Sequence, residues 1–156
     1  MNFNSMYPVE GVDFGEMFSG QYLLGLISTF DNRFQAKADK FFQEISWKQF
    51  FAIICINLCK ESPTIGELSE IMGSSHQNVK RILGVLEKKD FVKILADEKD
   101  GRKQRIYLTD KTRGFCESHE EESKQIIGNL FKGIPEENLM ITIKTIIEME
   151  RNVRKI

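Results

Sequence analysis

The 156-residue sequence has little of several features that mark specialised classes of protein. It has only three cysteines, and this odd number argues against a disulfide framework and for a reducing compartment. No apolar run approaches the roughly 18 residues that a membrane helix needs. The first fifteen residues lack the basic start of a signal peptide. These absences predict a cytoplasmic protein without membrane association.

Motifs for catalysis and metal binding are also missing. The sequence has no glycine-rich phosphate loop, no metalloprotease motif and no pairing of a nucleophile with a base. His76 and His119 are too few and too far apart to form a metal site with the cysteines. We therefore expect neither an enzyme nor a protein with a metal or another cofactor.

An excess of charge of one sign is lacking overall, because 22 Lys and Arg nearly balance 23 Asp and Glu. The positive charge is nevertheless concentrated. Residues 74–105 contain nine basic and five acidic residues, a local net charge of +4 in a chain whose total is -1. Such a segment is typical of a local site for a polyanion such as DNA.

The spacing of apolar residues predicts a mainly α-helical chain. Residues 1–17 contain Pro8 and two glycines without a sustained period, so we expect an N-terminal arm, available to pack on a partner. From residue 18, apolar side chains recur every three or four positions and predict a long helix. After residue 110, an intermittent apolar stripe ends at Gly133, and Pro135 opens a strongly apolar last helix.

The middle of the chain contains the starts of three helices. Ser46, Thr64 and Ser74 are each followed three residues later by Gln or Glu, the pattern of a capping box. Gly73 lies between the second and third of these helices, where it supplies a turn. A helix followed by a short helix, a glycine turn and a longer helix is the helix-turn-helix arrangement.

The periodicity changes after Asp90, where two strands are predicted over 91–95 and 105–109. Gly101 gives the polar connection conformational freedom, and Thr109 can cap the helix that follows. Such a hairpin is a wing. The expected fold class is therefore mainly α with a small β-hairpin wing, and the winged helix-turn-helix DNA-binding domain covers residues 46–109.

The helix that begins near Ser74 has an apolar side and a polar side that carries no carboxylate. Arginine recognises guanine, amides recognise adenine, and serine binds phosphate. We predict DNA contacts by Ser74, Gln77, Asn78, Lys80 and Arg81 of this helix and by Lys99, Arg102, Lys103 and Arg105 of the wing. Asp100 is placed to brace Arg102 through an ion pair. His76 lies near the apolar edge, where we expect a structural role. Similar polar faces are also common on helices that only face solvent.

The order of elements, with Asp100-Gly101-Arg102 in the wing and Ile106-Tyr107-Leu108-Thr109 after it, resembles the MarR family over roughly residues 20–153. The resemblance implies a homodimeric repressor or activator whose first and last helices interlock. It also implies that Ser75, Gln77, Asn78, Lys80 and Arg81 contact the major groove and that Arg102 acts in the wing. Two positions depart from the family pattern. Asp90 replaces the usual glycine and Lys93 the usual arginine, and aspartate tolerates the left-handed conformation better than most residues.

The first and last helices contain more apolar surface than one small winged helix covers. We expect a dimerisation region over 18–45 and 110–156, with Leu23, Ile27, Leu139, Ile143, Ile146 and Ile147 at the interface of a homodimer. A two-fold dimer presents two recognition helices, so it predicts an inverted-repeat site on double-stranded DNA with half-sites about 10 bp apart. The alternative is that these helices pack within one chain.

Two groups of residues are candidates for sensing. Cys55 and Cys59 lie four apart on one helix and, with Cys116, allow a redox switch, although inert core cysteines have the same pattern. The aromatic residues Phe30, Phe34, Trp47, Phe50 and Phe51 allow a pocket for a small aromatic effector, as the family resemblance implies. Core packing explains them equally well.

The leading hypothesis is a dimeric, sequence-specific DNA-binding transcriptional regulator that responds to a small-molecule effector. One alternative is a winged-helix protein-interaction module without DNA binding. Another is a cysteine-based redox-sensing regulator. The affinity for DNA and its dependence on salt distinguish the first hypothesis from the second.

Overall fold

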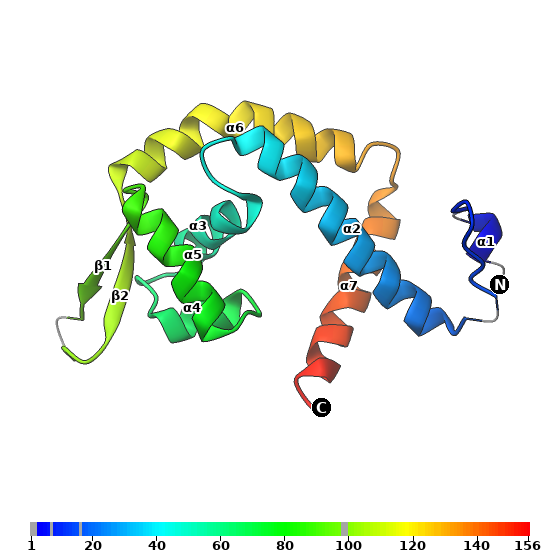
Figure 1. The fold of residues 1–156 in the computed structure, drawn as a ribbon, viewed down its shortest axis with the longest axis horizontal. Coiled ribbons are helices and arrows are strands. Elements are labelled where there is room, and N and C mark those ends of the chain that lie inside the picture. Colours follow the sequence, from blue (N-terminus) through cyan, green and yellow to red (C-terminus); the bar gives the residue numbers. More distant parts are fainter. Residues whose placement is uncertain (1–2, 7, 16, 98–99) are drawn as a thin grey trace. The chain divides into compact units, whose positions relative to one another are not determined.

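The computed structural model describes residues 3–6, 8–15, 17–97 and 100–156. Its elements are, in order, α1 (Phe3–Met6), α2 (Ser19–Phe42), α3 (Trp47–Leu58), α4 (Ile65–Ile71), α5 (His76–Lys88), β1 (Val92–Ala96), β2 (Gln104–Leu108), α6 (Asp110–Leu130) and α7 (Glu136–Val153) (Figure 1). This order confirms the predicted fold class. The chain divides into two compact units, Met1–Thr112 and Arg113–Ile156.

Local sequence signals set the starts of α3 and α4. Gln49 N donates to Ser46 Oγ at 3.3 Å, and Ser46 N donates to Gln49 Oε1 at 3.1 Å. Thr64 and Glu67 form the same reciprocal box at the start of α4. Each box satisfies backbone N–H groups that the first helical turn leaves without partners. Both predicted capping boxes are confirmed.

The start of α5 differs from the prediction by one residue. Ser75, not Ser74, caps the helix, and its Oγ accepts a hydrogen bond from Asn78 N at 3.3 Å. Gly73 has a φ of +57° in the turn before it, a conformation that glycine adopts without steric cost. Asp90 follows α5 with a φ of +59°, so this aspartate does adopt the left-handed conformation.

The core of the first unit is built from α3, α4, α5 and the hairpin. Its fully buried side chains include Ile53, Leu68, Phe91, Val92 and Ile106. Helix α5 contributes Val79, Ile82, Leu83 and Leu86, all buried. Burying a side chain of this size contributes about 1.5 to 3 kcal/mol. This apolar side therefore anchors α5 and directs its polar side outward.

The wing is an antiparallel hairpin in which Val92 pairs with Leu108 and Ala96 with Gln104. The observed strands differ from the predicted ones by one residue at each end. Ile106 N also donates to Pro63 O at 2.9 Å, so β2 is held by the segment before α4. Figure 1 shows the hairpin beside α4 and α5. The wing is thus attached to the helix-turn-helix and not only to its own strands.

The described part of the N-terminal arm packs on α2 of its own chain. The rings of Phe3 and Tyr22 stack with centroids 4.1 Å apart, and Phe14 meets Tyr22 edge-on at 5.1 Å. Asn4 Nδ2 donates to Asp13 Oδ1 at 2.7 Å, and Phe14 N donates to Asn4 Oδ1 at 2.9 Å. These contacts join both ends of the arm to the first turn of α2.

Helix α6 begins in the first unit, where Thr109 Oγ1 accepts a hydrogen bond from Thr112 N at 3.4 Å. Thr109 therefore caps the helix as predicted. In the second unit, Gly133 has a φ of +80° in the turn that follows α6. Helix α7 lies wholly within the described residues, and none of its side chains is buried in the single chain. Within the described ranges, no helix is both long and apolar enough to cross a membrane.

Candidate nucleic-acid interface

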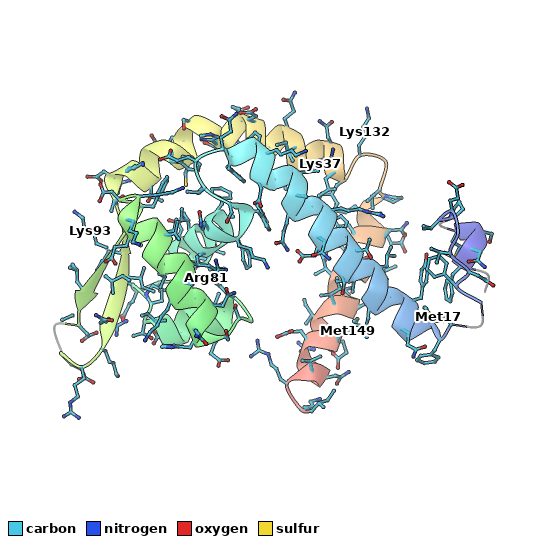
Figure 2. All side chains as sticks on the ribbon, viewed as in Figure 1. Met17, Lys37, Arg81, Lys93, Lys132 and Met149 are labelled. Carbon is cyan, nitrogen blue, oxygen red and sulfur yellow. The ribbon has the colours of Figure 1, made fainter. Side chains whose placement is uncertain are left out.

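The outward side of α5 carries a row of bonded polar side chains, one of which, Arg81, is labelled in Figure 2. Arg81 Nη2 donates to Asn78 Oδ1 at 3.0 Å, and Asn78 Nδ2 donates to Ser74 Oγ at 2.8 Å. Gln77 and Lys80 are exposed beside this row. The bond to Asn78 engages only part of the guanidinium fork and restricts its direction. The row therefore presents amide and guanidinium groups in a fixed order along one side of the helix.

A groove separates this side of α5 from the wing. It is lined by Thr64, Ile65, Gly66, Glu67, His76, Lys80, Arg102, Lys103, Gln104 and Arg105. Cationic residues from α5, β2 and the connection before β2 outnumber the single carboxylate, that of Glu67. A groove of this charge attracts phosphate oxygens. His76 is exposed and lines the groove, and its predicted structural role stays a prediction.

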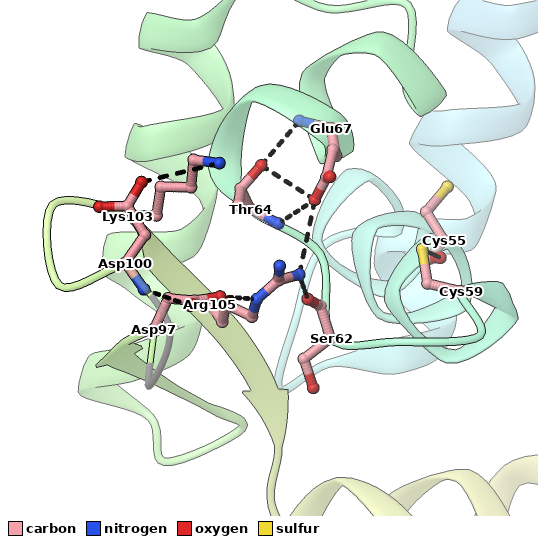
Figure 3. A network of polar contacts seen from close by, with 9 residues as sticks. All are labelled: Cys55, Cys59, Ser62, Thr64, Glu67, Asp97, Asp100, Lys103 and Arg105. Carbon is pink, nitrogen blue, oxygen red and sulfur yellow. Dashed lines mark hydrogen bonds and ion pairs between the residues drawn. The ribbon is translucent and has the colours of Figure 1, made fainter.

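Arg105 attaches the wing to the segment around α4 (Figure 3). Its Nε donates to the Asp97 carboxylate, and its Nη1 donates to Ser62 O at 2.7 Å. The hydrogen bond with Asp97 is the main cause of the raised pKa of Arg105. Three-quarters of the side chain is buried, with 25% exposed. These contacts give Arg105 a positioning role for the wing, and its direct contact with DNA stays a prediction.

The Glu67 carboxylate links this network to the start of α4. It accepts a hydrogen bond from Thr64 N at 2.7 Å and lies 3.9 Å from Arg105 Nη1. The bonds from the Thr64 backbone and hydroxyl, and to a smaller extent the charge of Arg105, lower the pKa of Glu67. The capping box and the wing therefore share one carboxylate.

Asp97 and Asp100 shape the tip of the wing through its backbone. Asp97 is buried, and its Oδ1 accepts a hydrogen bond from Asp100 N at 2.8 Å. Asp100 Oδ1 in turn accepts from Arg102 N at 3.2 Å, and its Oδ2 lies 3.8 Å from Lys103 Nζ. Asp100 thus supports Arg102 through the main chain, in place of the predicted ion pair with the guanidinium. Lys99, another predicted contact, lies outside the described residues.

The structure places the remaining predicted contacts on two adjoining surfaces. Ser74, Ser75, Gln77, Asn78, Lys80 and Arg81 lie at the start and on the outward side of α5, and Arg102 and Lys103 lie across the groove. Asp97 was missed by the sequence analysis. It directly follows β1, but its partner is known only once the strand register is known.

The three cysteines are free thiols. Burial raises the pKa of Cys55, and the neighbouring Cys59 raises it further. Burial also raises the pKa of Cys116, with a smaller effect from Glu117. A raised pKa lowers the thiolate fraction at neutral pH and therefore the reactivity towards oxidants. The described parts of the chain contain no group of three or more His, Cys, Asp or Glu arranged for a metal ion.

The candidate effector residues form a continuous series of ring contacts between α2 and α3. Phe34 contacts Phe30 at 6.1 Å and Trp47 at 4.7 Å, and Trp47 contacts Phe51 at 6.3 Å between ring centroids. Phe30 is 51% exposed and Phe51 is 37% exposed. The series therefore reaches the surface of the first unit at both ends, and its use by an effector stays a prediction.

The predicted dimer residues are partly or largely exposed in the single chain. The exposed fractions are 37% for Leu23, 41% for Ile143, 46% for Ile146 and 46% for Ile147, while Ile27 and Leu139 are half-buried. Neighbouring apolar residues such as Leu24 and Ile141 are more exposed still, at 58% and 55%. Exposed apolar side chains that gather on one helix commonly mark an interaction site.

A model of the MarR family matches residues 56–103, from the end of α3 to the connection before β2. No curated protein matches the chain. The solved structure of a MarR/EmrR family transcriptional regulator from Acinetobacter sp. ADP1 is similar, with a TM-score of 0.79 and 15% identity over 90% of this chain and 100% of that one.

Two other solved structures have the same fold. The MarR protein from Peptoclostridium difficile has a TM-score of 0.79 and 19% identity, over 94% of this chain and 96% of that one. MepR of S. aureus, solved as a complex with DNA, has a TM-score of 0.73 and 18% identity, over 89% of this chain and 99% of that one.

Proposed function

We propose that this chain is a transcriptional regulator of the MarR family that acts as a homodimer and binds an inverted-repeat site on double-stranded DNA. The observation that carries the proposal is the cationic groove between α5 and the wing, next to the polar side of α5. The family consists of regulators rather than enzymes, in agreement with the sequence analysis. A role on DNA is also consistent with the predicted cytoplasmic location.

In this proposal α5 enters the major groove. Gln77, Asn78 and Arg81 face the base edges, where amides recognise adenine and arginine recognises guanine. Ser75 and the first N–H groups of α5 contact phosphate, which a helix N-terminus binds well. Arg102, at the tip of the wing, reaches the adjacent minor groove. Arg105 and Asp97 hold the wing at the distance from α5 that both contacts require.

The dimer in this proposal buries the apolar sides of α2 and α7 against a second copy of the chain. Residues 18–45 and 110–156 form the dimerisation region, and residues 46–109 form the DNA-binding domain. The exposure of Leu23, Ile143 and Ile147 in the single chain supports this assignment, because water-exposed apolar surface favours burial on association. Two α5 helices related by a two-fold axis require half-sites about 10 bp apart.

A small aromatic effector is the finer part of the proposal. It would stack within the series Phe30, Phe34, Trp47 and Phe51. Trp47 is the single tryptophan of the chain, so its fluorescence reports directly on this place. Saturable quenching of the Trp47 emission by an aromatic carboxylate such as benzoate would support the effector site. An emission that benzoate leaves unchanged, in the parent and in Phe51→Ala alike, would contradict it.

The test of DNA binding is an electrophoretic shift with the DNA upstream of the protein's own gene, repeated over a range of salt concentrations. The logarithm of the association constant should fall linearly with the logarithm of the salt concentration. Arg102→Ala should reduce this slope by about one, because one cation that neutralises phosphate charge is lost. Lys132→Ala, an exposed change after α6, is the control and should leave the slope unchanged.

Negligible, salt-insensitive DNA affinity would contradict the proposal. Capture of a defined protein partner under the same conditions would then favour the protein-interaction module, which has the same fold without the DNA contact.

A further inference from the structure

The short segment between α2 and α3 is attached to two other elements of the first unit. Lys89 Nζ, at the end of α5, donates to the backbone carbonyl of Glu44. Lys111 Nζ, in the first turn of α6, donates to the Glu44 carboxylate. Lys111 Nζ also donates to Lys89 O at 3.0 Å. Glu44, Lys89 and Lys111 therefore form a closed set of contacts, which we term the Glu44 junction.

The backbone next to Glu44 has a conformation that needs such support. Gln43 has a φ of +47° and a ψ of -48° at the end of α2. A non-glycine residue in a sparsely populated region is strained and persists only where its surroundings enforce it. Phe42 and Ile45 on either side are buried, with 4% and 3% exposed. The segment is therefore a constrained connection and not a free hinge.

Lys111 is itself held against the core. Its Nζ lies 4.5 Å from the centre of the Phe91 ring, a cation–π contact. Phe91 is fully buried, and its backbone N donates to Leu86 O at 2.9 Å, at the end of α5. The cation that binds Glu44 is thus positioned by the residues that connect α5 to the wing.

The elements that meet at the junction have different parts in the proposed function. Helix α2 carries one of the apolar sides assigned to the dimer, and α5 reads DNA. The exposed ion pair contributes little to stability, since Glu44 is 46% and Lys111 is 40% exposed and water screens their attraction. The main effect of the contacts is therefore on the direction of α5 relative to α2.

We infer that Glu44 is a positioning residue for DNA recognition, because its junction with Lys89 and Lys111 sets the spacing between the two recognition helices of the dimer. The inference rests on the proposed function, since it requires a dimer that binds two half-sites. It predicts that loss of the Glu44 carboxylate changes the tolerance of the protein for half-site spacing more than its thermal stability.

The experiment measures Kd for full-length protein on a series of DNA sites in which base pairs are added or removed between the half-sites. One base pair moves a half-site by about 3.4 Å and rotates it by about 35°. The parent should lose about tenfold or more in affinity for each change of one base pair. Glu44→Gln should lose less than about threefold, because its recognition helices adapt to the altered spacing.

Two further variants make the result specific. Lys111→Gln should flatten the spacing profile as Glu44→Gln does, and the double variant should be no flatter than Lys111→Gln alone, because the ion pair between Glu44 and Lys111 is already lost in that variant. Glu120→Gln is the matched control, because it removes a carboxylate of the same type from an exposed pair, 2.7 Å from Lys124 Nζ, within α6 alone. It should keep the parental profile.

A parental spacing profile in both Glu44→Gln and Lys111→Gln would overturn the inference while leaving the proposed function intact. A parent that binds none of the sites would overturn the proposed function, and the inference with it. If Glu44→Gln unfolds, the profile of Lys111→Gln decides between these outcomes, since Lys111→Gln removes the same ion pair and leaves the Glu44 side chain in place.

Discussion

Arg105 and Asp97 are joined across the two strands of the wing, because the Nε of Arg105 donates to the carboxylate of Asp97. The Asp97 side chain is only 7% exposed. A buried carboxylate needs a partner of this kind, since the charged form is costly to remove from water. The same guanidinium also bonds to Ser62 O, so this pair connects the hairpin with the segment before α4.

The energetic coupling of this pair can be measured in a double-mutant cycle. Arg105→Ala leaves the Asp97 carboxylate buried without its guanidinium, and Asp97→Ala removes the acceptor. We expect a coupling energy of about 0.5 to 3 kcal/mol from urea unfolding of the two single variants and the double variant. If the losses in the free energy of unfolding of the two single variants add up to the loss in the double variant, the assigned role of the pair is contradicted.

Arg81 should determine sequence preference more than overall affinity. Arg81→Ala should weaken binding to the preferred site by about 1 to 3 kcal/mol. The variant protein should also discriminate less against substitutions at one base pair of each half-site. The measurement is a competition experiment with sites that vary at single positions. Lys132→Ala serves as the control with one positive charge fewer. Equal losses on preferred and substituted sites would show that Arg81 contacts only phosphate.

Ile143 should be required for dimerisation. Ile143→Arg places a charge on the apolar side of α7, and an unpaired charge is strongly disfavoured in a buried interface. We expect a monomer by light scattering after size-exclusion chromatography, with a large loss of affinity for the inverted repeat. Thr145→Arg is the control, because a residue two positions away lies on the other side of the helix. A dimeric Ile143→Arg protein would exclude this side of α7 from the interface.

Glu67 should contribute an acid-dependent part of the stability. Its pKa is lowered in the folded protein, mainly by the hydrogen bond from the Thr64 backbone. Its contribution is therefore complete above the ordinary value of 4.5 and is lost as the pH falls through the lower folded value. Glu67→Gln keeps an acceptor for Thr64 N but does not titrate.

The melting temperature tests this contribution. The difference in Tm between the parent and Glu67→Gln should be largest near pH 7 and should shrink as the pH is lowered below 4.5. Glu70→Gln, on the exposed side of the same helix, is the control. A Tm difference that is constant with pH would show that the charge of Glu67 has no part in the stability.

The cysteines should not regulate DNA binding. The pKa values of Cys55 and Cys116 are raised, so little thiolate is present at neutral pH. Hydrogen peroxide at concentrations that oxidise reactive thiols should leave the affinity for DNA unchanged. A loss of affinity that Cys55→Ala or Cys116→Ala prevents would instead support the redox-sensing alternative.

Features that depend on neighbouring residues were predictable from the sequence. The capping boxes at Ser46 and Thr64 each need only two residues three apart, and both formed. The start of α5 was misplaced because Ser74 and Ser75 are both competent caps. In the structure Ser74 N donates to Ser69 O at 3.0 Å in the turn after α4, so Ser74 belongs to this turn and Ser75 is the N-cap residue of α5.

The sequence by itself determined the order of the helices, the hairpin and the polar side of α5, because these follow from helical and strand periods that act over a few residues. The tertiary structure alone decided the partners of the charged groups that join distant segments. Arg105 reaches Ser62 across 43 positions, and Lys111 reaches Glu44 across 67. Such pairs leave no local pattern, because only the packing of α2, α5 and the wing on a common core brings these charges together.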